Sequence, residues 1–241
     1  MITFDDGHYT KFQDASISGT GYLAYRDIPK IIDLYKINLN KILDFGCASG
    51  RSTNFLNKLS KLVCACDISP RAVSIVKKSI TNKAFINNLK SDFYQYYPYT
   101  SIFTFFTFLH LTSKEEIIDE LKRCNNSLEY NGFLTIVTAH KNLFYKNYVS
   151  VGCIDNNPNL DGDITQIKLK KIDCEVTNCF WEYSTLSELA NQCGFNIAGI
   201  HFPVGDQIDK QDYIDEYSFS PYVYLVLKKH ETKFLPIGNR F

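Results

Sequence analysis

The sequence has no surplus of positive charge, since 26 Lys and Arg residues balance 26 Asp and Glu residues. Only five of the cations are Arg, the side chain best suited to forked contacts with phosphate. Proteins dedicated to nucleic acids usually carry a basic excess. The composition therefore disfavours a nucleic-acid partner.

Long apolar runs are also missing. The most apolar stretch, residues 102–111, is far shorter than the roughly 20 residues that span a membrane, so we expect no membrane segment. The first twelve residues have neither a basic stretch nor an apolar core, and they do not predict a secretory signal. The eight Cys residues form no CxxC pair, which disfavours a disulfide framework. We therefore expect a reduced, cytoplasmic protein.

Aromatic residues are abundant by contrast, with 16 Tyr and 18 Phe. The content of 45% hydrophobic and 22% charged residues is typical of a globular chain, and 241 residues suit one elaborated domain. Many tyrosines would also suit a pocket that holds a flat or apolar ligand.

Short apolar segments alternate with amphipathic ones along the first half of the chain. We expect strands at 41–45, 62–66, 84–86, 101–107 and 133–138, separated by helices at 27–35, 52–59, 69–80 and 114–128. Continuously apolar strands joined by helices indicate a parallel sheet that is covered on both faces. With strands at 195–200 and 222–228, the sequence predicts an α/β fold: a doubly wound, mostly parallel, seven-stranded sheet.

The pattern changes between residues 140 and 183. This part is rich in Asn, Asp and Gly up to residue 163, and then predicts an added β-hairpin at 164–171 and 174–181. We therefore divide the chain into a mobile N-terminal arm (1–26), one domain (27–229) that contains the inserted flap (140–183), and a flexible tail (230–241).

Three polar features follow the ends of predicted strands. The run Gly46-Cys47-Ala48-Ser49-Gly50 follows the first strand, and its glycines would let the backbone turn sharply and approach a ligand. Asp67 ends the second strand, where a carboxylate can accept hydrogen bonds from the two hydroxyls of a ribose. Asp92 follows the third, where it could accept from an adenine amino group. Taken alone, the glycine run could equally be a structural turn, and Asp67 could equally cap the helix that follows it. Their combination indicates a nucleoside site.

These features resemble the class I S-adenosylmethionine-dependent methyltransferases, over about residues 22–229. In that family the glycine turn passes under the methionine part of the cofactor, and the two acids hold the ribose and the adenine. Ala48 takes the place of the usual middle glycine, and a nicotinamide-binding fold would need Gly-x-Gly-x-x-Gly instead. The resemblance implies a cofactor site made of Tyr22, Arg26, Asp44, Gly46, Ala48, Ser49, Gly50, Asp67, Ile68, Ser91, Asp92, Phe93 and Phe108.

The acceptor side is less well marked. The resemblance places residues 106–111 over the transferable methyl group, so His110 is a candidate general base, or else a packing histidine. Arg26 is a candidate partner of the cofactor carboxylate, or else a surface residue. Tyr9, Tyr25 and Trp181 are candidate substrate contacts, although a core role for Trp181 is equally open. Cys174 and Cys179 lack paired His ligands, so we expect no metal site.

The expected activity is in-line methyl transfer from S-adenosylmethionine to an N, O or C atom of a small molecule. A non-catalytic cofactor-binding or partner-binding protein is one alternative, and an RNA or protein methyltransferase is another. The latter would need a basic rim or an Asn/Asp-Pro-Pro-Tyr-type motif, which residues 107–110 do not provide. A weaker resemblance to toxoflavin synthase-like enzymes does not name the acceptor, and the sequence leaves the oligomeric state unknown.

Overall fold

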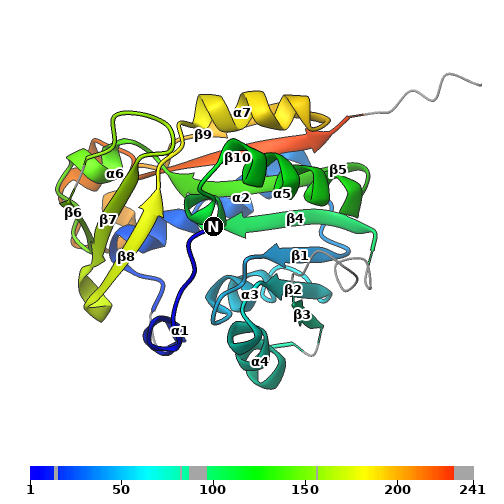
Figure 1. The fold of residues 1–241 in the computed structure, drawn as a ribbon, viewed down its shortest axis with the longest axis horizontal. Coiled ribbons are helices and arrows are strands. Elements are labelled where there is room, and N and C mark those ends of the chain that lie inside the picture. The colour runs from blue at the N-terminus through cyan, green and yellow to red at the C-terminus, as the bar shows by residue number, and fades with distance from the viewer. Residues whose placement is uncertain (14–15, 82, 87–96, 156, 231–241) are drawn as a thin grey trace, which may run out of the picture.

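A seven-stranded sheet forms the centre of the protein (Figure 1). The computed structural model describes residues 1–13, 16–81, 83–86, 97–155 and 157–230. The strand order is β3–β2–β1–β4–β5–β10–β9. β1 to β5 pair in parallel and β10 runs antiparallel to both its neighbours, which confirms the predicted sheet. The strands are β1 (Ile42–Phe45), β2 (Val63–Asp67), β3 (Ala84–Ile86), β4 (Tyr99–Phe105), β5 (Leu128–Ala139), β9 (Phe195–His201) and β10 (Tyr222–Lys229).

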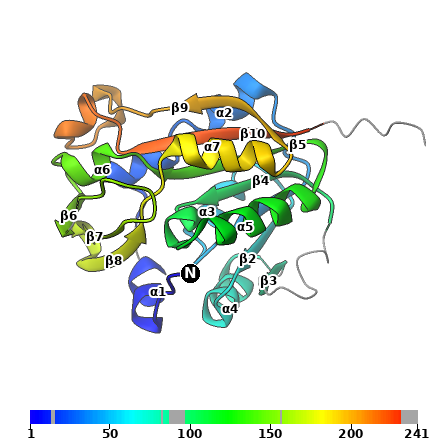
Figure 2. The ribbon, with the colours of Figure 1, turned by 45° about the horizontal axis from the view of Figure 1, so that its top comes forward.

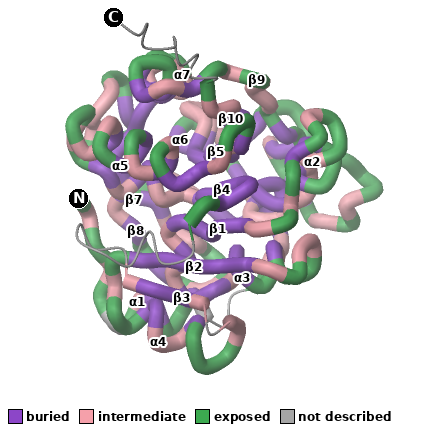
Figure 3. Tube along the Cα trace, turned by 90° about the vertical axis from the view of Figure 1, so that its right-hand side faces the viewer, coloured by how far each residue is buried: buried purple, intermediate pink, exposed green. Residues whose placement is uncertain are grey.

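Helices cover both faces of this sheet, as predicted. Because successive side chains of a strand point to opposite faces, each strand has buried side chains on both faces of the sheet. Phe103 of β4 shares a cluster with residues of α2 (Ile28–Tyr35) and α3 (Arg51–Leu56), and Ala65 of β2 packs with α4 (Pro70–Ser79). Ile102 instead shares a cluster with α5 (Lys114–Ser127) and α7 (Tyr183–Gln192), which lie together over the other face (Figure 2). Figure 3 shows the strands buried between these layers.

A second, three-stranded antiparallel sheet lies beyond the carboxyl ends of β1 and β4 (Figure 1). Its strands are β6 (Val151–Asp155), β7 (Ile164–Leu169) and β8 (Cys174–Cys179), with η4 (Lys170–Ile172) between the last two. The sequence predicted only the hairpin of β7 and β8. β6 follows the short helix α6 (Asn142–Tyr145) and pairs with β7 with an irregular register, so its pattern in the sequence is weak.

The N-terminal segment contains two elements that the sequence did not indicate, α1 (Asp6–Gln13) and the 3-10 helix η1 (Gly19–Ala24). α1 contains Gly7 and Thr10, both poor helix formers, and contacts elsewhere in the chain anchor it. Lys11 Nζ donates to the carbonyl of Asp173, 2.7 Å away. The backbone N–H of Ile2 donates to the carbonyl of His110 at 2.7 Å. The segment therefore packs on the domain in this structure.

One predicted boundary is wrong. The sequence predicts a helix that ends at residue 128 and a strand that begins only at residue 133, with Asn131-Gly132 as the stop between them. In the structure α5 ends at Ser127 and β5 begins at the next residue. Asn131 has a φ of 61° and lies inside β5, where the pairing with β4 shifts register. The Asn-Gly pair therefore marks an irregularity within a strand, not the end of a helix. The predicted tail from residue 231 onward lies outside the described residues.

Candidate functional site

A cavity of about 320 Å³ opens at the carboxyl ends of β1, β2 and β4. The central sheet forms one side of it, and the three-stranded sheet and the N-terminal segment form the other. Its walls include the turn after β1, the end of β2, η3 (Thr107–His110) and parts of α1 and β8. Of the predicted site residues, it is lined by Tyr9, Tyr25, Gly46, Ala48, Asp67, Ile68 and His110.

The turn after β1 needs its two glycines for contacts within the protein. Both have left-handed backbone, with φ of 79° at Gly46 and 93° at Gly50. A Cβ on Gly46 would lie 2.0 Å from Oγ1 of Thr107, which itself donates to the carbonyl of Phe45. A Cβ on Gly50 would lie 2.1 Å from Cδ1 of Ile80. Gly50 does not line the cavity. Packing against side chains therefore requires both glycines, and close approach of this turn to a ligand stays a prediction.

Asp67 links this turn to the end of β2. Its Oδ2 accepts the backbone N–H of Ala48 at 2.8 Å, and its Oδ1 accepts that of Ser69 at 2.9 Å. Burial raises the pKa of Asp67, and these N–H groups oppose the shift. Each carboxylate oxygen can accept two hydrogen bonds, so both keep one acceptor position. Asp67 lines the cavity and can therefore bind a pair of hydroxyls there.

Asp44 lies outside the cavity lining, beneath the turn. It is fully buried, and its Oδ2 accepts hydroxyl hydrogens from Ser52 and Thr53 of α3 at 2.7 and 2.6 Å. The pKa of Asp44 is raised to about 7, mainly by burial and also by the negative charge of Asp67. The hydrogen bonds from the two hydroxyls oppose this rise. The structure thus shows Asp44 joining β1 to α3.

We predict that Asp44 makes the protein less stable as the pH rises from 5 to 7. In this range the unfolded carboxyl, with a pKa of about 3.9, is ionised, whereas the buried one still holds its proton. The unfolded state therefore binds fewer protons, and the free energy of unfolding falls by up to about 1.4 kcal/mol per pH unit. Urea unfolding of the wild type and Asp44→Asn across this range measures the effect. The variant should lack this slope, and parallel curves would contradict the prediction.

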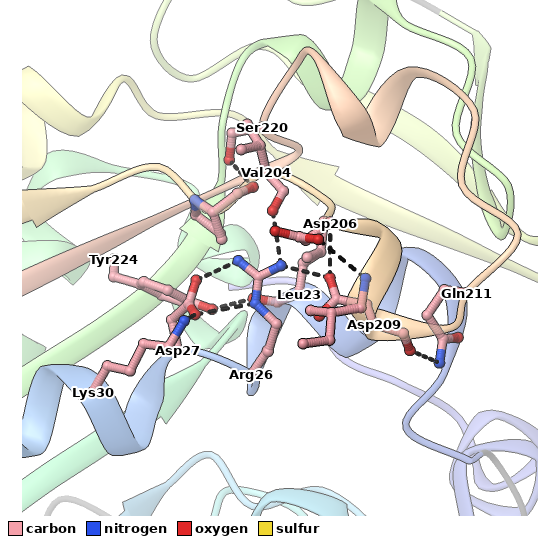
Figure 4. Close-up of polar contacts among 12 residues, drawn as sticks. Leu23, Arg26, Asp27, Lys30, Val204, Asp206, Asp209, Gln211, Ser220 and Tyr224 are labelled. Carbon is pink, nitrogen blue, oxygen red and sulfur yellow. Dashed lines mark hydrogen bonds and ion pairs between the residues drawn. The ribbon is translucent and has the colours of Figure 1, made fainter.

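Arg26 is not among the residues that line the cavity, and Figure 4 shows its guanidinium between the side chains of Asp27 and Asp209. Its guanidinium pairs with Asp27 and with Asp209, both at 2.6 Å. It donates as well to the carbonyl of Val204 at 2.8 Å. The Asp209 side chain is 4% exposed, so the ion pair is shielded from water. Arg26 therefore connects the start of α2 to the 203–220 loop, which contains η5 (Gln207–Asp209) and η6 (Asp215–Tyr217).

Arg51, which the sequence reasoning missed, is the arginine that lines the cavity. It is the first residue of α3 and directly follows Gly50. It forms no ion pair with a carboxylate of the described residues. Burial raises the pKa of Tyr25 and of Tyr222, and the charge of Arg51 opposes both shifts. The sequence signal that could have indicated Arg51 as a cavity residue is its position directly after the glycine turn.

His110 lies at the end of η3, beneath the N-terminal segment. Its ring packs edge-on against Phe4, with centroids 4.6 Å apart. Its Nδ1 is buried and has no partner among the described residues. Burial lowers the pKa of His110 to about 4, so the imidazole is neutral at pH 7. Tyr25 stacks on Phe105 of β4 at 4.6 Å and also lines the cavity.

The other predicted site residues lie outside the lining of the cavity. Trp181 is 4% exposed, and its Nε1 donates to the carbonyl of Leu111, which places it in the core. Phe108 is 1% exposed and belongs to the cluster beneath α5. Tyr22 and Ser49 do not line the cavity either. The predicted adenine contacts lie outside the described residues: Ser91, Asp92 and Phe93.

Metal-binding clusters and membrane-spanning helices are absent from the described ranges. No group of three His, Cys, Asp or Glu side chains there could hold a metal ion. No helix in the same ranges is long and apolar enough to cross a bilayer. All eight cysteines are unpaired, and seven of them are buried, Cys153 of β6 being half-buried.

Comparison with known proteins identifies the fold. Residues 43–134 match the model of the methyltransferase domain family, and no curated protein sequence matches the chain. An S-adenosylmethionine-dependent methyltransferase from Clostridium acetobutylicum is 13% identical, with 93% of this chain and 97% of that one covered and a TM-score of 0.63. A protein from Pyrococcus horikoshii is 14% identical, with 95% and 100% covered and a TM-score of 0.64.

A third structure was solved with S-adenosylmethionine bound. It is an amino pentose methyltransferase of calicheamicin biosynthesis from Micromonospora echinaspora, 11% identical, with 95% of this chain and 98% of that one covered and a TM-score of 0.60. The narrower resemblance to toxoflavin synthase-like enzymes stays a prediction. Residues 43–134 thus match a methyltransferase domain, and the chain as a whole has the fold of the S-adenosylmethionine-dependent methyltransferases.

Proposed function

We propose that this enzyme transfers the methyl group of S-adenosylmethionine to a nitrogen, oxygen or carbon atom of a small molecule. The observation that carries the proposal is a single cavity that extends from the glycine turn and Asp67 to the three-stranded sheet. Ligands of open parallel sheets bind beyond the carboxyl ends of the strands, where this cavity lies. Two small ligands can therefore meet inside one chamber.

The described residues fit an adenosyl ligand that carries an amino acid part. Asp67 has acceptor positions for two neighbouring hydroxyls. Arg51 is a cation with no acidic partner within the described part of the chain, and is suited to a carboxylate. Ile68, 38% exposed, gives an apolar surface beside Asp67. When bound, this cofactor supplies a methyl group on a positively charged sulfur, which the acceptor atom displaces in line. Adenine contacts by Asp92 stay a prediction.

The residues of the cavity wall would align the reactants and exclude water. Holding two reactants at attack distance contributes about 7–11 kcal/mol. Tyr25 and Tyr222 present aromatic rings to the cavity, and a cation over such a ring gains about 0.5–2 kcal/mol. Nδ1 of neutral His110 has no partner in the described part of the chain and can accept a hydrogen bond from the acceptor atom, while burial makes the imidazole a weak base. A role of His110 as general base stays a prediction.

A small acceptor suits the walls of this chamber. Phe12 of α1 and Val176 of β8 both line it, so the N-terminal segment and the three-stranded sheet enclose the side opposite the cofactor residues. The formal net charge of zero also gives no general attraction to a polyanion. Both observations favour a small molecule over RNA or a folded protein.

Calorimetric titration with S-adenosylmethionine and S-adenosylhomocysteine tests the proposal. We expect saturable binding of both well below millimolar concentration, because polar and charged groups in the cavity match them. Incubation with methyl-labelled cofactor and a small-molecule extract should then give a labelled product by mass spectrometry. Absence of binding at millimolar concentration would refute cofactor use. Binding without any labelled product would favour the non-catalytic alternative.

A further inference from the structure

Part of the cavity is lined by uncharged side chains from the N-terminal segment, η3 and the three-stranded sheet. We call it the acceptor wall, and define it by Phe4, Phe12, His110, Ile167, Val176 and Asn178. Ile167 of β7 and Val176 of β8 are directly paired in the three-stranded sheet, and Asn178 follows two positions later on the same face of β8. Two of the six residues are polar, and they decide what the wall can bind.

Asn178 is a buried amide that lacks a partner. It is 2% exposed, lines the cavity, and its Nδ2 has no hydrogen bond within the described part of the chain. Native proteins pair nearly all buried polar groups, since an unpaired one bears the full cost of desolvation. A polar group of a ligand in the cavity is therefore the natural partner of this amide.

His110, at the end of η3, has a second buried polar atom without a partner in the described part of the chain. Its Nδ1 is buried and unbonded, and Phe4 packs against its ring. The hydrogen bond from Trp181 Nε1 to the carbonyl of Leu111, 2.8 Å long, ties the chain just beyond β8 to the residue after His110. β8 and η3, which carry Asn178 and His110, also contact each other, so the two residues lie on adjoining parts of the acceptor wall.

The charged side chains that line the cavity are not part of the acceptor wall. Lys171 is exposed to water and donates to Oγ of Ser18 at 2.9 Å, and Glu120 lies 3.4 Å from Arg123. Asp67 and Arg51 belong to the cofactor end. A charged acceptor would lose its hydration against the acceptor wall without gaining an opposite charge, which is strongly unfavourable. The wall therefore selects against ions.

We propose that the methyl acceptor is an uncharged, largely apolar ring compound whose hydroxyl group accepts a hydrogen bond from Asn178 Nδ2 and donates one to His110 Nδ1. The inference rests on the proposed function, because it assigns the substrate class of that same site. A neutral imidazole has one nitrogen free to accept a hydrogen bond, and an amide can both donate and accept. A hydroxyl satisfies both residues at once.

Three probes of equal ring size test the charge selection in the wild-type protein: 2-naphthol, 2-naphthoate and 2-naphthylmethylamine. Each is titrated by calorimetry with saturating S-adenosylhomocysteine and again without it. We expect 2-naphthol to bind at least about tenfold more tightly than either ion. Tighter binding of an ion, or no binding of 2-naphthol at millimolar concentration, would overturn the inference. Titration of S-adenosylhomocysteine alone reports separately on the proposed function.

The variant Asn178→Leu tests the amide itself. Leucine has a similar size but no polar group, so we expect 2-naphthol to bind about five- to tenfold more weakly, with unchanged affinity for S-adenosylhomocysteine. Asn191→Leu, at an exposed position of α7, serves as the matched control. The thermal midpoint of each variant verifies folding. If the folded Asn178→Leu protein binds 2-naphthol as the wild type does, Asn178 does not contact the acceptor.

Discussion

Replacement of Asp67 by alanine is expected to weaken binding of S-adenosylhomocysteine by about 100-fold or more. Asp67 lines the cavity with an acceptor position free on each carboxylate oxygen. Hydrogen bonds to a charged group contribute about 1.5–3 kcal/mol each, and two would be lost together. Calorimetric titration of the wild type and the variant measures the change, and an unchanged dissociation constant would contradict the assignment.

The same substitution also removes the acceptor for the N–H groups of Ala48 and Ser69, so the turn itself could shift. A second ligand separates the two effects. Adenosine has the two ribose hydroxyls and 2′,3′-dideoxyadenosine lacks both. The wild type should prefer adenosine by at least about tenfold, and Asp67→Ala should lose this preference. A preference that survives in the variant would place the hydroxyls elsewhere.

The second large effect is expected at Arg51. Asp67 would fix the nucleoside, while Arg51 would fix the amino acid carboxylate of the cofactor. Loss of a charge-assisted hydrogen bond predicts about 10- to 100-fold weaker binding of S-adenosylhomocysteine to Arg51→Ala. Binding of 5′-methylthioadenosine, which lacks the amino acid part, should stay within about twofold of the wild type. Calorimetry with both ligands gives the comparison.

Arg26→Ala is the matched control for this pair of ligands. Arg26 is paired with Asp27 and Asp209, so the variant should unfold at a lower temperature than the wild type. Its relative affinity for S-adenosylhomocysteine and 5′-methylthioadenosine should be unchanged. If Arg26→Ala loses this discrimination and Arg51→Ala keeps it, the carboxylate contact belongs to Arg26.

Much of the central fold could be predicted from the sequence because its signals are local. Apolar runs such as Leu62–Cys66 mark buried parallel strands, and Ser69-Pro70 starts α4, where the Ser69 hydroxyl accepts the N–H of Ala72. The elements that were missed depend on distant contacts. α1 rests on the carbonyls of Asp173 and Glu175, which no pattern within Asp6–Gln13 reveals.

The site was predicted in part, for a similar reason. Gly46 and Asp67 follow strand ends, and topology alone brings strand ends together. The choice between Arg26 and Arg51 depends on Asp209, which is far along the sequence and holds Arg26 away from the cavity. Asn178 gave no sequence signal at all, because an Asn in a strand becomes notable only when its amide is buried without a partner.

The distribution of the cysteines makes this protein convenient for fluorescence work. Cys153 is the one cysteine that is not buried, and it lies on β6, the outer strand of the three-stranded sheet. A maleimide dye should therefore attach there without any mutagenesis. Burial raises the pKa of this thiol, so labelling should be faster at mildly alkaline pH. Such a dye would report in real time how the three-stranded sheet responds when ligands enter or leave the chamber.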